Sequence, residues 1–396
     1  MAQTDRLVAI DIARSVAMLL ALAAHAGFQT SLDLPVIAAL ALRIATPLFI
    51  VLFGAMVTLI YVPSRERSGL SQTAVKCWSR SLQCCLFFWL NILALGFMDS
   101  FSLPYLVLCL LMLDTSPFVG ILKYYAIMFF LLPGIIELIR KTGTRVLLAA
   151  ALAYHALYPL LKAIPDPPEF SHQTILLRVD LLLFGTGTQT MIAGPSILHS
   201  LALFFGGCWL GEWLKRTREQ GAMDSTRPIM PLIGSFCLLI AYSLLVPGPG
   251  QLTAVALGNM HLRNLNHPAY VGIYGLVAIA GVAILYRLSN FYRLPTSLLF
   301  LSRRPQFAFG FGNFLIVLWP RALGHVIGAT ANCTLLLACA IALVFVYDSL
   351  MRSDAKRSIA ARLVQDATQA ISSATSSLAA MIWYTGLGAR RQPIDR

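Results

Sequence analysis

The sequence is short of charged residues and correspondingly rich in apolar ones. Of its 396 residues, 12% are charged and 58% are hydrophobic, and the mean hydropathy is +0.75. A soluble domain is about half apolar and about a quarter charged. The scarcity of charge therefore excludes an ordinary soluble domain and predicts an all-α fold, namely a polytopic integral membrane helical bundle.

Signatures of several soluble enzyme classes are absent as well. The chain has no Walker motif, no dinucleotide-binding glycine fingerprint in a strand–helix context, no HExxH and no GxSxG. These absences disfavour soluble-type nucleotide hydrolysis and serine-hydrolase chemistry. The eight cysteines lie in or beside apolar runs and include no CxxC pair. We therefore expect small buried hydrophobic residues there, and neither a disulfide framework nor a metal site.

The basic excess, a net charge of +13, does not indicate a nucleic-acid partner. The lysines and arginines fall mostly in short segments between apolar runs, where they determine membrane topology. The N-terminal MAQTDR is too short and too polar for a signal peptide. The first apolar run is therefore expected to be retained as a helix.

Ten apolar stretches are candidate transmembrane helices. They are residues 8–28, 36–62, 77–98, 118–139, 146–162, 195–214, 229–246, 268–288, 296–318 and 331–350. A further apolar run, 103–113, is too short to cross a bilayer alone. It fits a half-helix or part of a longer fourth segment.

The distribution of positive charge predicts the orientation of this bundle, because basic residues favour the cytoplasmic side. With the N-terminus inside, the outer segments hold only Lys162, Arg178, Arg263 and Arg321. The inner loops hold Arg65, Arg67, Lys76, Arg80, Arg140, Lys141, Arg145, Lys215, Arg216, Arg218, Arg227, Arg287, Arg293, Arg303 and Arg304. About ten spans then place both termini in the cytoplasm and the protein in the cell inner membrane.

The first apolar run carries three ionisable residues, Asp11, Arg14 and His25. A charge at the centre of a membrane helix costs about 2.5–3.5 kcal/mol on insertion scales, so a simple anchor has no reason to keep three. Arg14 and His25 are eleven positions apart, which places them on one helix face about 16 Å apart along the axis. We interpret His25 as a general base, with a structural histidine as the alternative.

A second group of candidates lies near the outer ends of later spans. Arg43 precedes Pro47, which lacks a backbone donor and is expected to interrupt the second span, and Gly54, which permits close helix approach. Snorkelling of Arg43 to the interface is the structural alternative. With Arg43, the other candidates for acceptor binding are Lys123, His155, Arg178 and Asp180. Mutual pairing of Arg178 and Asp180 is the alternative for those two.

Two segments outside the spans are distinctive. Residues 163–194 begin with prolines and end rich in glycine and threonine, which is typical of a re-entrant or capping element over a cavity. Residues 351–396 are polar and basic, with apolar residues at helical spacing. We expect a cytoplasmic tail with an amphipathic surface helix, and disorder is the alternative.

The pattern of Arg14, ten intervening residues and His25 resembles the signature of the membrane-bound acyltransferase-3 superfamily. The run ATPLFIVLFG is similar to that family's second span, and VKCWSRSLQ, with Lys76 and Arg80, to the basic cluster before its third. GILKYYAIMFFLLP resembles the fourth-span region of the glucan-succinylating and sugar O-acetylating branches. Two features depart from the family: Ser15 stands where relatives often have glycine, and the basic cluster is reduced to two residues.

The resemblance implies an acyl-CoA-dependent O-acyltransferase, of the EC 2.3.1 type, over residues 1–350. Such an enzyme moves an acyl group from cytoplasmic acyl-CoA to a hydroxyl of a glycan, lipid or other envelope acceptor. Acyl-CoA is then a cosubstrate, and no bound cofactor is expected. Arg14 would help to hold the donor and His25 would activate the acceptor. The charges of a CoA donor also suit the inner cations Arg65, Arg67, Lys76 and Arg80.

In this interpretation, donor and acceptor approach His25 from opposite faces through one continuous tunnel. Arg14 would lie toward the inner mouth, and Arg43, Lys123 and His155 would line the acceptor side. Two other functions stay open: N-acylation of amino sugars, and transport around the same polar stripe. The absence of an internal repeat disfavours transport. Membrane lipids are expected partners, and a homo-oligomer stays an alternative to a monomer.

Overall fold

The computed structural model is all-helical, without a strand in the residues that it describes. These residues are 7–98, 102–114, 118–164, 175–186, 196–220, 229–245, 253, 257–258, 261–292, 299–320, 323–353 and 359–387. The helices are α1 (Val8–Gln29), α2 (Val36–Arg43), α3 (Ala45–Met56), α4 (Val62–Met98), α5 (Leu103–Leu110), α6 (Gly120–Thr142), α7 (Thr144–Ala156), α8 (Tyr158–Lys162), α9 (Ile175–Phe184), α10 (Ile197–Gln220), α11 (Met230–Leu245), α13 (His261–Asn264), α14 (Pro268–Phe291), α15 (Leu299–Arg303), α16 (Pro305–Leu318), α17 (Leu323–Ile327), α18 (Ala329–Arg352) and α19 (Ile359–Ile382). Two π-helical turns, η2 (Val57–Tyr61) and η5 (Trp383–Leu387), complete the set.

Six stretches of the described residues are long and apolar enough to cross a membrane. They are Val8–Gln29, Val36–Met98, Gly120–Thr142, Ile197–Glu219, Pro268–Ser289 and Ala329–Arg352. The stretch Val36–Met98 contains both the second and the third span expected from the sequence. The seventh and ninth expected spans correspond to the shorter apolar helices Met230–Leu245 and Pro305–Leu318. The described residues thus confirm the all-helical fold, and their six candidate spans support a membrane protein.

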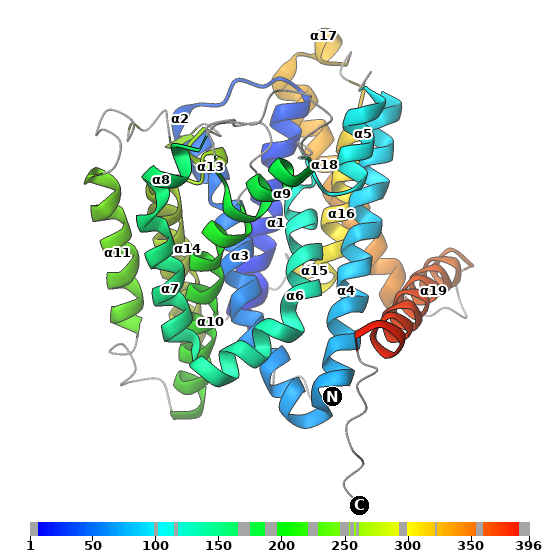
Figure 1. The fold of residues 1–396 in the computed structure, drawn as a ribbon. Helices are drawn as coiled ribbons and strands as arrows, with labels where there is room; N and C mark the ends of the chain where they lie inside the picture. Colours follow the sequence, from blue (N-terminus) through cyan, green and yellow to red (C-terminus); the bar gives the residue numbers. More distant parts are fainter. Residues whose placement is uncertain are drawn as a thin grey trace, which may run out of the picture.

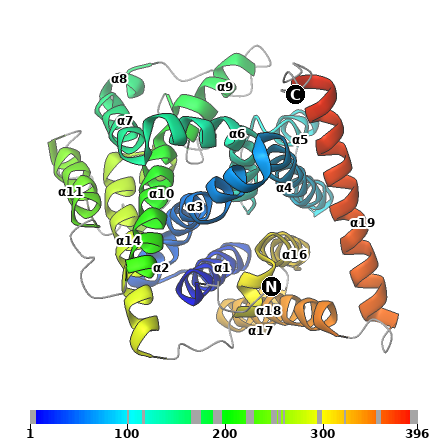
Figure 2. The ribbon, with the colours of Figure 1, turned by 90° about the horizontal axis from the view of Figure 1, so that it is seen from below.

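The long helices run roughly side by side, and short helices gather at their ends (Figure 1). The helices α2, α5, α13 and α17 lie at one end, at the top of Figure 1, and the turn between α6 and α7 lies at the other. Helix α19 lies across the bundle instead of along it. Seen from below in Figure 2, α19 forms one edge of the molecule, beside α4 and α18.

The second expected span is interrupted, as its proline predicts. Helix α2 ends at Arg43 and α3 begins at Ala45. Pro47 has no N–H, so the carbonyl of Arg43, four residues earlier, lacks its normal helical partner. That carbonyl accepts a hydrogen bond of 3.4 Å from the hydroxyl of Tyr270 in α14. The break therefore gives α14 a specific contact with the end of α2, directly before α3.

Glycines bring α3 and α10 into backbone contact. A Cβ added at Gly54 would lie 2.0 Å from the carbonyl oxygen of Phe204, and one at Gly207 would lie 2.0 Å from that of Val51. The hydroxyl of Thr58 then donates to the carbonyl of Cys208 across the same interface at 3.0 Å. Small residues drive close helix packing in membranes, where lipid removes the usual hydrophobic driving force.

Helix α3 continues into α4 through the π-helical turn η2. π-helical turns are common at functional sites, and Tyr61 at the end of η2 lines the pocket described below. Helix α4 is itself broken at Gly69, whose φ of +81° is a left-handed value that glycine adopts without a steric penalty. The bend turns the chain back toward the bundle, so the remainder of α4 packs against α6 and α16.

Two further expectations concern segments between the spans. The run 103–113 forms the short helix α5, which fits the expected half-helix. Much of the expected capping element, residues 163–194, lies outside the described residues. Its described part includes α9, which packs against α10.

The α3–α10 contact gives a stability prediction. Gly54→Ala should lower the unfolding midpoint in detergent, because the new methyl group meets the backbone of α10; overpacking of this kind costs about 1–3 kcal/mol. Gly134→Ala in α6 and Gly281→Ala in α14 are matched controls, since nothing lies within 4 Å of an added Cβ at either position. Equal midpoints for Gly54→Ala and the controls would contradict the close contact.

Candidate active site

A pocket of about 960 Å³ lies among α1, α3, α4, α6, α16, α18 and α19. Its volume is near the top of the range of about 300–1,000 Å³ for small-molecule sites. Helix α1 supplies Arg14 and Met18 to its wall, and α4 supplies residues from Arg80 to Leu90. The pocket therefore joins the first span to helices from the far end of the chain.

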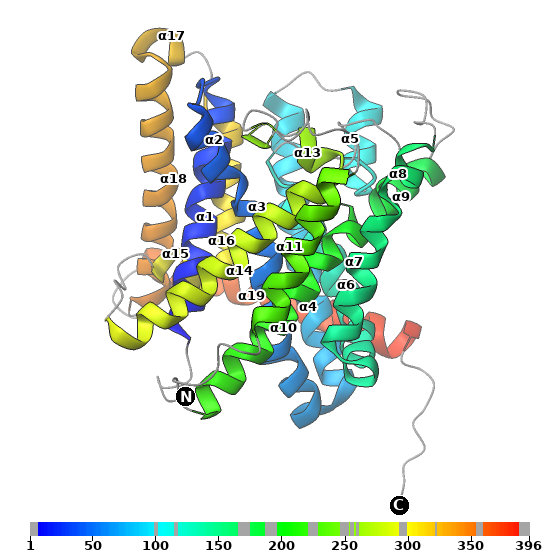
Figure 3. The ribbon, with the colours of Figure 1, turned by 90° about the vertical axis from the view of Figure 1, so that its left-hand side faces the viewer.

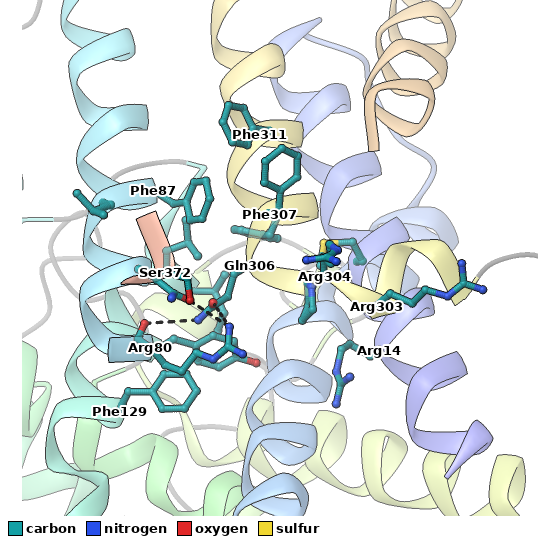
Figure 4. Close-up of a pocket in the computed structure, with 18 of the residues that line it drawn as sticks. Arg14, Arg80, Phe87, Phe129, Arg303, Arg304, Gln306, Phe307, Phe311 and Ser372 are labelled. Carbon is teal, nitrogen blue, oxygen red and sulfur yellow. Dashed lines mark hydrogen bonds between the residues drawn. The ribbon is translucent and has the colours of Figure 1, made fainter. Parts of the chain in front are cut away.

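Four arginines concentrate positive charge in this pocket. They are Arg14, Arg80, Arg303 and Arg304, and no Asp or Glu is among the described residues that line it (Figure 4). Arg303 donates to the buried Asp348 at 2.8 Å, and the guanidinium of Arg304 lies 6.0 Å from the ring of Tyr347. Arginine clusters bind phosphate groups through charge-assisted hydrogen bonds. The arrangement suits an anionic, phosphate-bearing ligand.

Arg14 is held at the pocket wall by its own helix and by the chain before α16. Its Nη1 donates to Asp11 Oδ1 at 3.3 Å and to the carbonyl of Ser302 at 3.5 Å. Asp11 lies one turn before Arg14 and is buried, as the shared face of the first span predicts. Part of the charge of the first span is thus neutralised within the protein.

The rest of the pocket is apolar and aromatic. Side chains of Phe49, Phe53, Tyr125 and Phe129 line it from α3 and α6, and their rings make edge and tilted contacts with one another. The wall reaches Phe309 of α16. The pocket thus combines a cationic region with an apolar region, which suits a ligand with an anionic head and an uncharged arm.

The imidazole of His25 lies next to the ring of Phe309, and His25 is not among the described residues that line the pocket. The two rings meet edge to face with centroids 5.9 Å apart. Phe118, in the turn before α6, makes a similar contact at 5.6 Å. His25 Nδ1 is 2.6 Å from Asn313 Oδ1. Asn313 Nδ2 donates to the carbonyl of Phe309 at 2.8 Å, so the amide presents its oxygen to the imidazole.

This hydrogen bond determines the tautomer of His25. An amide oxygen only accepts, so Nδ1 carries the proton and Nε2 keeps its lone pair. The described residues provide no hydrogen-bond partner for Nε2. The imidazole is therefore oriented as a base, in the way that a second group orients the histidine of a catalytic triad.

Three polar or aromatic residues at this site share one face of α16. Gln306, Phe309 and Asn313 follow the i, i+3, i+7 spacing. Gln306 accepts from Arg80 at 3.1 Å, Phe309 separates pocket from imidazole, and Asn313 orients His25. A single helix face thus connects the arginine region with the imidazole.

The expected continuous tunnel is not what the structure shows. Phe309 lines the pocket that contains Arg14, but neither His25 nor Arg43 is among the described residues that line it. The ring of Phe309 fills the expected path because it packs against both His25 and Phe49. The arginine pocket and the imidazole are neighbours, with the ring of Phe309 between them.

Cations outside the arginine pocket also lie near His25. The charges of Arg43 and Arg263 act on its ring, and Arg263 acts on Lys123 as well. Arg43 donates to the carbonyl of Gly258 at 2.9 Å. Burial lowers the pKa of Arg263, in α13, below its ordinary value. Arginine nevertheless stays protonated at neutral pH, so this end of the bundle is positive.

Lys123 and Arg178 both contact Asp114. Lys123 donates to the carbonyl of Asp114 at 2.9 Å, and Arg178 donates to the carboxylate of Asp114 at 2.5 Å. Both side chains of this ion pair are about 5% exposed. Arg178 therefore pairs with Asp114 and not with Asp180, which accepts a hydrogen bond from Thr186. The alternative that Arg178 and Asp180 pair with each other is therefore wrong.

His155 lies in a different cluster. Its Nε2 is 3.1 Å from the carbonyl of His199, the two rings lie 5.0 Å apart, and both side chains are buried. The structure places it between α7 and α10. Its expected role at the acceptor stays a prediction without a contact to His25.

Three of the expected donor-binding cations point elsewhere. Arg65 pairs with Glu137 of α6 at 2.6 Å, Arg67 donates to the carbonyl of Pro63 at 3.3 Å, and Lys76 donates to Ser64 at 3.3 Å. None of the three lines the arginine pocket. Arg303 and Arg304 line it instead. Their signal in the sequence is the basic run SRRPQ, directly before the apolar part of the ninth expected span.

The part of the chain from α1 to the start of α5 is similar to a known family. Residues 6–103 match the family model of the OpgC protein. OpgC is an osmoregulated periplasmic glucan succinyltransferase, and the match supports the glucan-acyltransferase branch of the resemblance. The matched residues include Arg14, His25 and Arg80, whereas Arg303, Arg304 and Asn313 lie outside them. No curated protein matches the chain.

The orientation of His25 gives a prediction for Asn313. Asn313→Leu should reduce kcat for acyl transfer by about 10- to 1,000-fold with little change in the donor KM, because the imidazole loses the group that fixes its tautomer. Asn332→Leu is the control: Asn332 is a buried amide that accepts from Trp319 and does not contact His25. An unchanged kcat in Asn313→Leu would show that this hydrogen bond does not orient a catalytic base.

Proposed function

We propose that this protein is an integral-membrane O-acyltransferase of the acyltransferase-3 type. It transfers an acyl group from cytoplasmic acyl-CoA to a hydroxyl of a glucan or a related envelope glycan or lipid. The observation that carries the proposal is the juxtaposition of an arginine-lined pocket and an oriented imidazole across Phe309. The match of residues 6–103 to OpgC supports the acyl-transfer chemistry and a glucan as the acceptor class.

The donor fits the pocket by its chemistry. The nucleotide and diphosphate of CoA carry its negative charge and would bind at Arg14, Arg80, Arg303 and Arg304. The uncharged pantetheine arm would follow the aromatic wall toward Phe309. A small movement of that ring would then bring the thioester to His25, since side-chain rotation is fast compared with turnover.

The transfer needs no covalent enzyme intermediate. Nε2 of His25 takes the proton of the acceptor hydroxyl, and the oxygen attacks the thioester carbonyl. The carbon–sulfur bond then breaks, and the CoA thiolate receives the proton from the imidazolium. The outer cations around Arg43, Arg263 and Lys123 would hold the acceptor near His25 or stabilise the developing oxyanion.

The topology that suits this reaction has about ten spans and both termini in the cytoplasm of the cell inner membrane. The basic start of α4 and the basic ends of α6 and α10 would then face the cytoplasm, where acyl-CoA is found. The acceptor would approach from the opposite end of the bundle, where α2, α5 and α13 lie (Figure 3).

The first test is removal of the base. With succinyl-CoA and a soluble β-glucan oligosaccharide as probes, the purified protein should release free thiol in detergent. His25→Ala should lower the rate by about 100- to 10,000-fold, which is the usual contribution of a general base. His325→Ala is the control, because His325 is exposed in α17. Near-normal transfer by His25→Ala would exclude this mechanism, and gradient-driven uptake without thiol release would favour a transporter.

The second test distinguishes the pocket arginines from other inner cations. Arg304→Gln should raise the KM for the CoA donor by about 10-fold or more, because a charge-assisted hydrogen bond contributes about 1.5–3 kcal/mol. Arg67→Gln removes an exposed arginine outside the pocket and should leave KM near its normal value. Equal effects of the two variants would contradict donor binding in this pocket.

A further inference from the structure

The tail helix α19 forms one wall of the arginine pocket. Val364, Ala367, Thr368, Ile371 and Ser372 line the pocket from α19, and Ser372 lies beside Gln306 and Arg80 in Figure 4. This helix follows the domain that the sequence assigned to catalysis, and it lies outside the residues that match OpgC. Its place at the pocket is therefore not implied by the family match.

A chain of hydrogen bonds connects α19 to Arg80. Gln83 Nε2 donates to Thr375 Oγ1 at 3.2 Å, and Arg80 Nη1 donates to Gln83 Oε1 at 3.0 Å. Thr375 is 5% exposed and Gln83 is 9% exposed. Because Gln83 uses its amide nitrogen on Thr375, its amide oxygen is turned toward Arg80.

The hydroxyl of Thr375 acts as the acceptor in its hydrogen bond with Gln83. Its proton goes to the carbonyl of Ile371, one turn earlier in α19, at 2.9 Å. The lone pairs of Oγ1 accept from Gln83 Nε2. Ser79 Oγ, 3.2 Å away, is a second partner of the same hydroxyl. On its other side, Arg80 Nη1 donates to Gln306 Oε1. The guanidinium is thus held between two amide oxygens, and α19 orients one of them.

Other contacts dock α19 independently of Thr375. Ser79 is 3.0 Å from the hydroxyl of Ser376, and Tyr347 is 3.2 Å from that of Thr368. The rings of Trp78 and Trp383 meet edge to face at 5.1 Å. Loss of the Thr375 hydroxyl alone should therefore leave the helix in place, and a change at Arg80 can be separated from undocking.

We propose that α19 completes the donor site and that Thr375 is a positioning residue, which holds the guanidinium of Arg80 toward the donor phosphates through Gln83. The inference rests on the proposed function, because it takes a CoA ester as the ligand of the pocket. It adds the C-terminal helix to the binding machinery and makes donor affinity depend on a segment far from the first span in sequence.

Thr375→Val tests the proposal. Valine keeps the β-branched shape and loses the hydroxyl, so Gln83 loses its partner in α19. Ser79 also loses its contact with Thr375 but keeps the one with Ser376. Binding of CoA to the purified full-length protein, measured by calorimetry, should weaken by about 3- to 10-fold. The KM for succinyl-CoA should rise equally, and kcat should stay near normal. Thr375→Ser should restore binding, and Thr385→Val, at an exposed threonine near the end of the tail, should have no effect.

A double variant separates positioning from general damage to the fold. In an Arg80→Gln background, Thr375→Val should weaken CoA binding no further, because coupled residues are not additive. An equal loss in both backgrounds, or unchanged binding in Thr375→Val alone, would overturn the positioning role.

The same binding measurement separates this inference from the proposed function. Normal CoA binding that responds to Thr375→Val, without thiol release by any variant, would refute the transferase and leave the positioning role intact. A wild-type protein that binds no CoA would refute the donor pocket and this inference together.

Discussion

The hydrogen bond between His25 and Asn313 is the interaction on which the site depends. It joins the first long helix to α16 and leaves Nε2 as the basic nitrogen of the imidazole. The same face of α16 carries Phe309 against the His25 ring and Gln306 against Arg80. A shift of α16 along its axis would therefore move three residues at once: Asn313 and Phe309, which contact His25, and Gln306, which contacts Arg80.

The scaffold around this helix face is held by features that membranes favour. Gly54 and Gly207 let α3 and α10 touch through their backbones, and Pro47 creates a break whose open carbonyl binds Tyr270. Both features fix α3, and α3 supplies the aromatic wall of the pocket through Phe49 and Phe53. Close packing far from the imidazole thus determines the shape of the cavity beside it.

Positive charge lies on both sides of the Phe309 ring, which separates the arginine pocket from His25. On the pocket side are arginines from the first span, α4 and the chain before α16. On the other side, the charges of Arg43 and Arg263 reach His25. In the proposed acyl transfer, an anionic donor would bind on one side and an oxyanion would form near the imidazole, and this division would supply positive charge for both. The intramembrane cations are consistent with function rather than with anchoring.

The sequence by itself determined the class of fold, the first span and its two functional candidates. Long apolar runs with few charges leave only a helical membrane bundle, and the eleven-residue spacing of Arg14 and His25 follows from helix geometry alone. The break near Pro47 and the close approach at Gly54 were also predictable, because both are backbone effects of single residues.

Only the tertiary structure decided which side chains contact His25, Arg14 and Arg80. Asn313, Arg303 and Thr375 lie hundreds of residues from His25, Arg14 and Arg80, and local spacing carries no information about which helices pack together. For the same reason, Arg65 and Lys76 were indistinguishable from Arg80 in the sequence: which cation faces a pocket depends on the rotation of α4 against α6, α16 and α19.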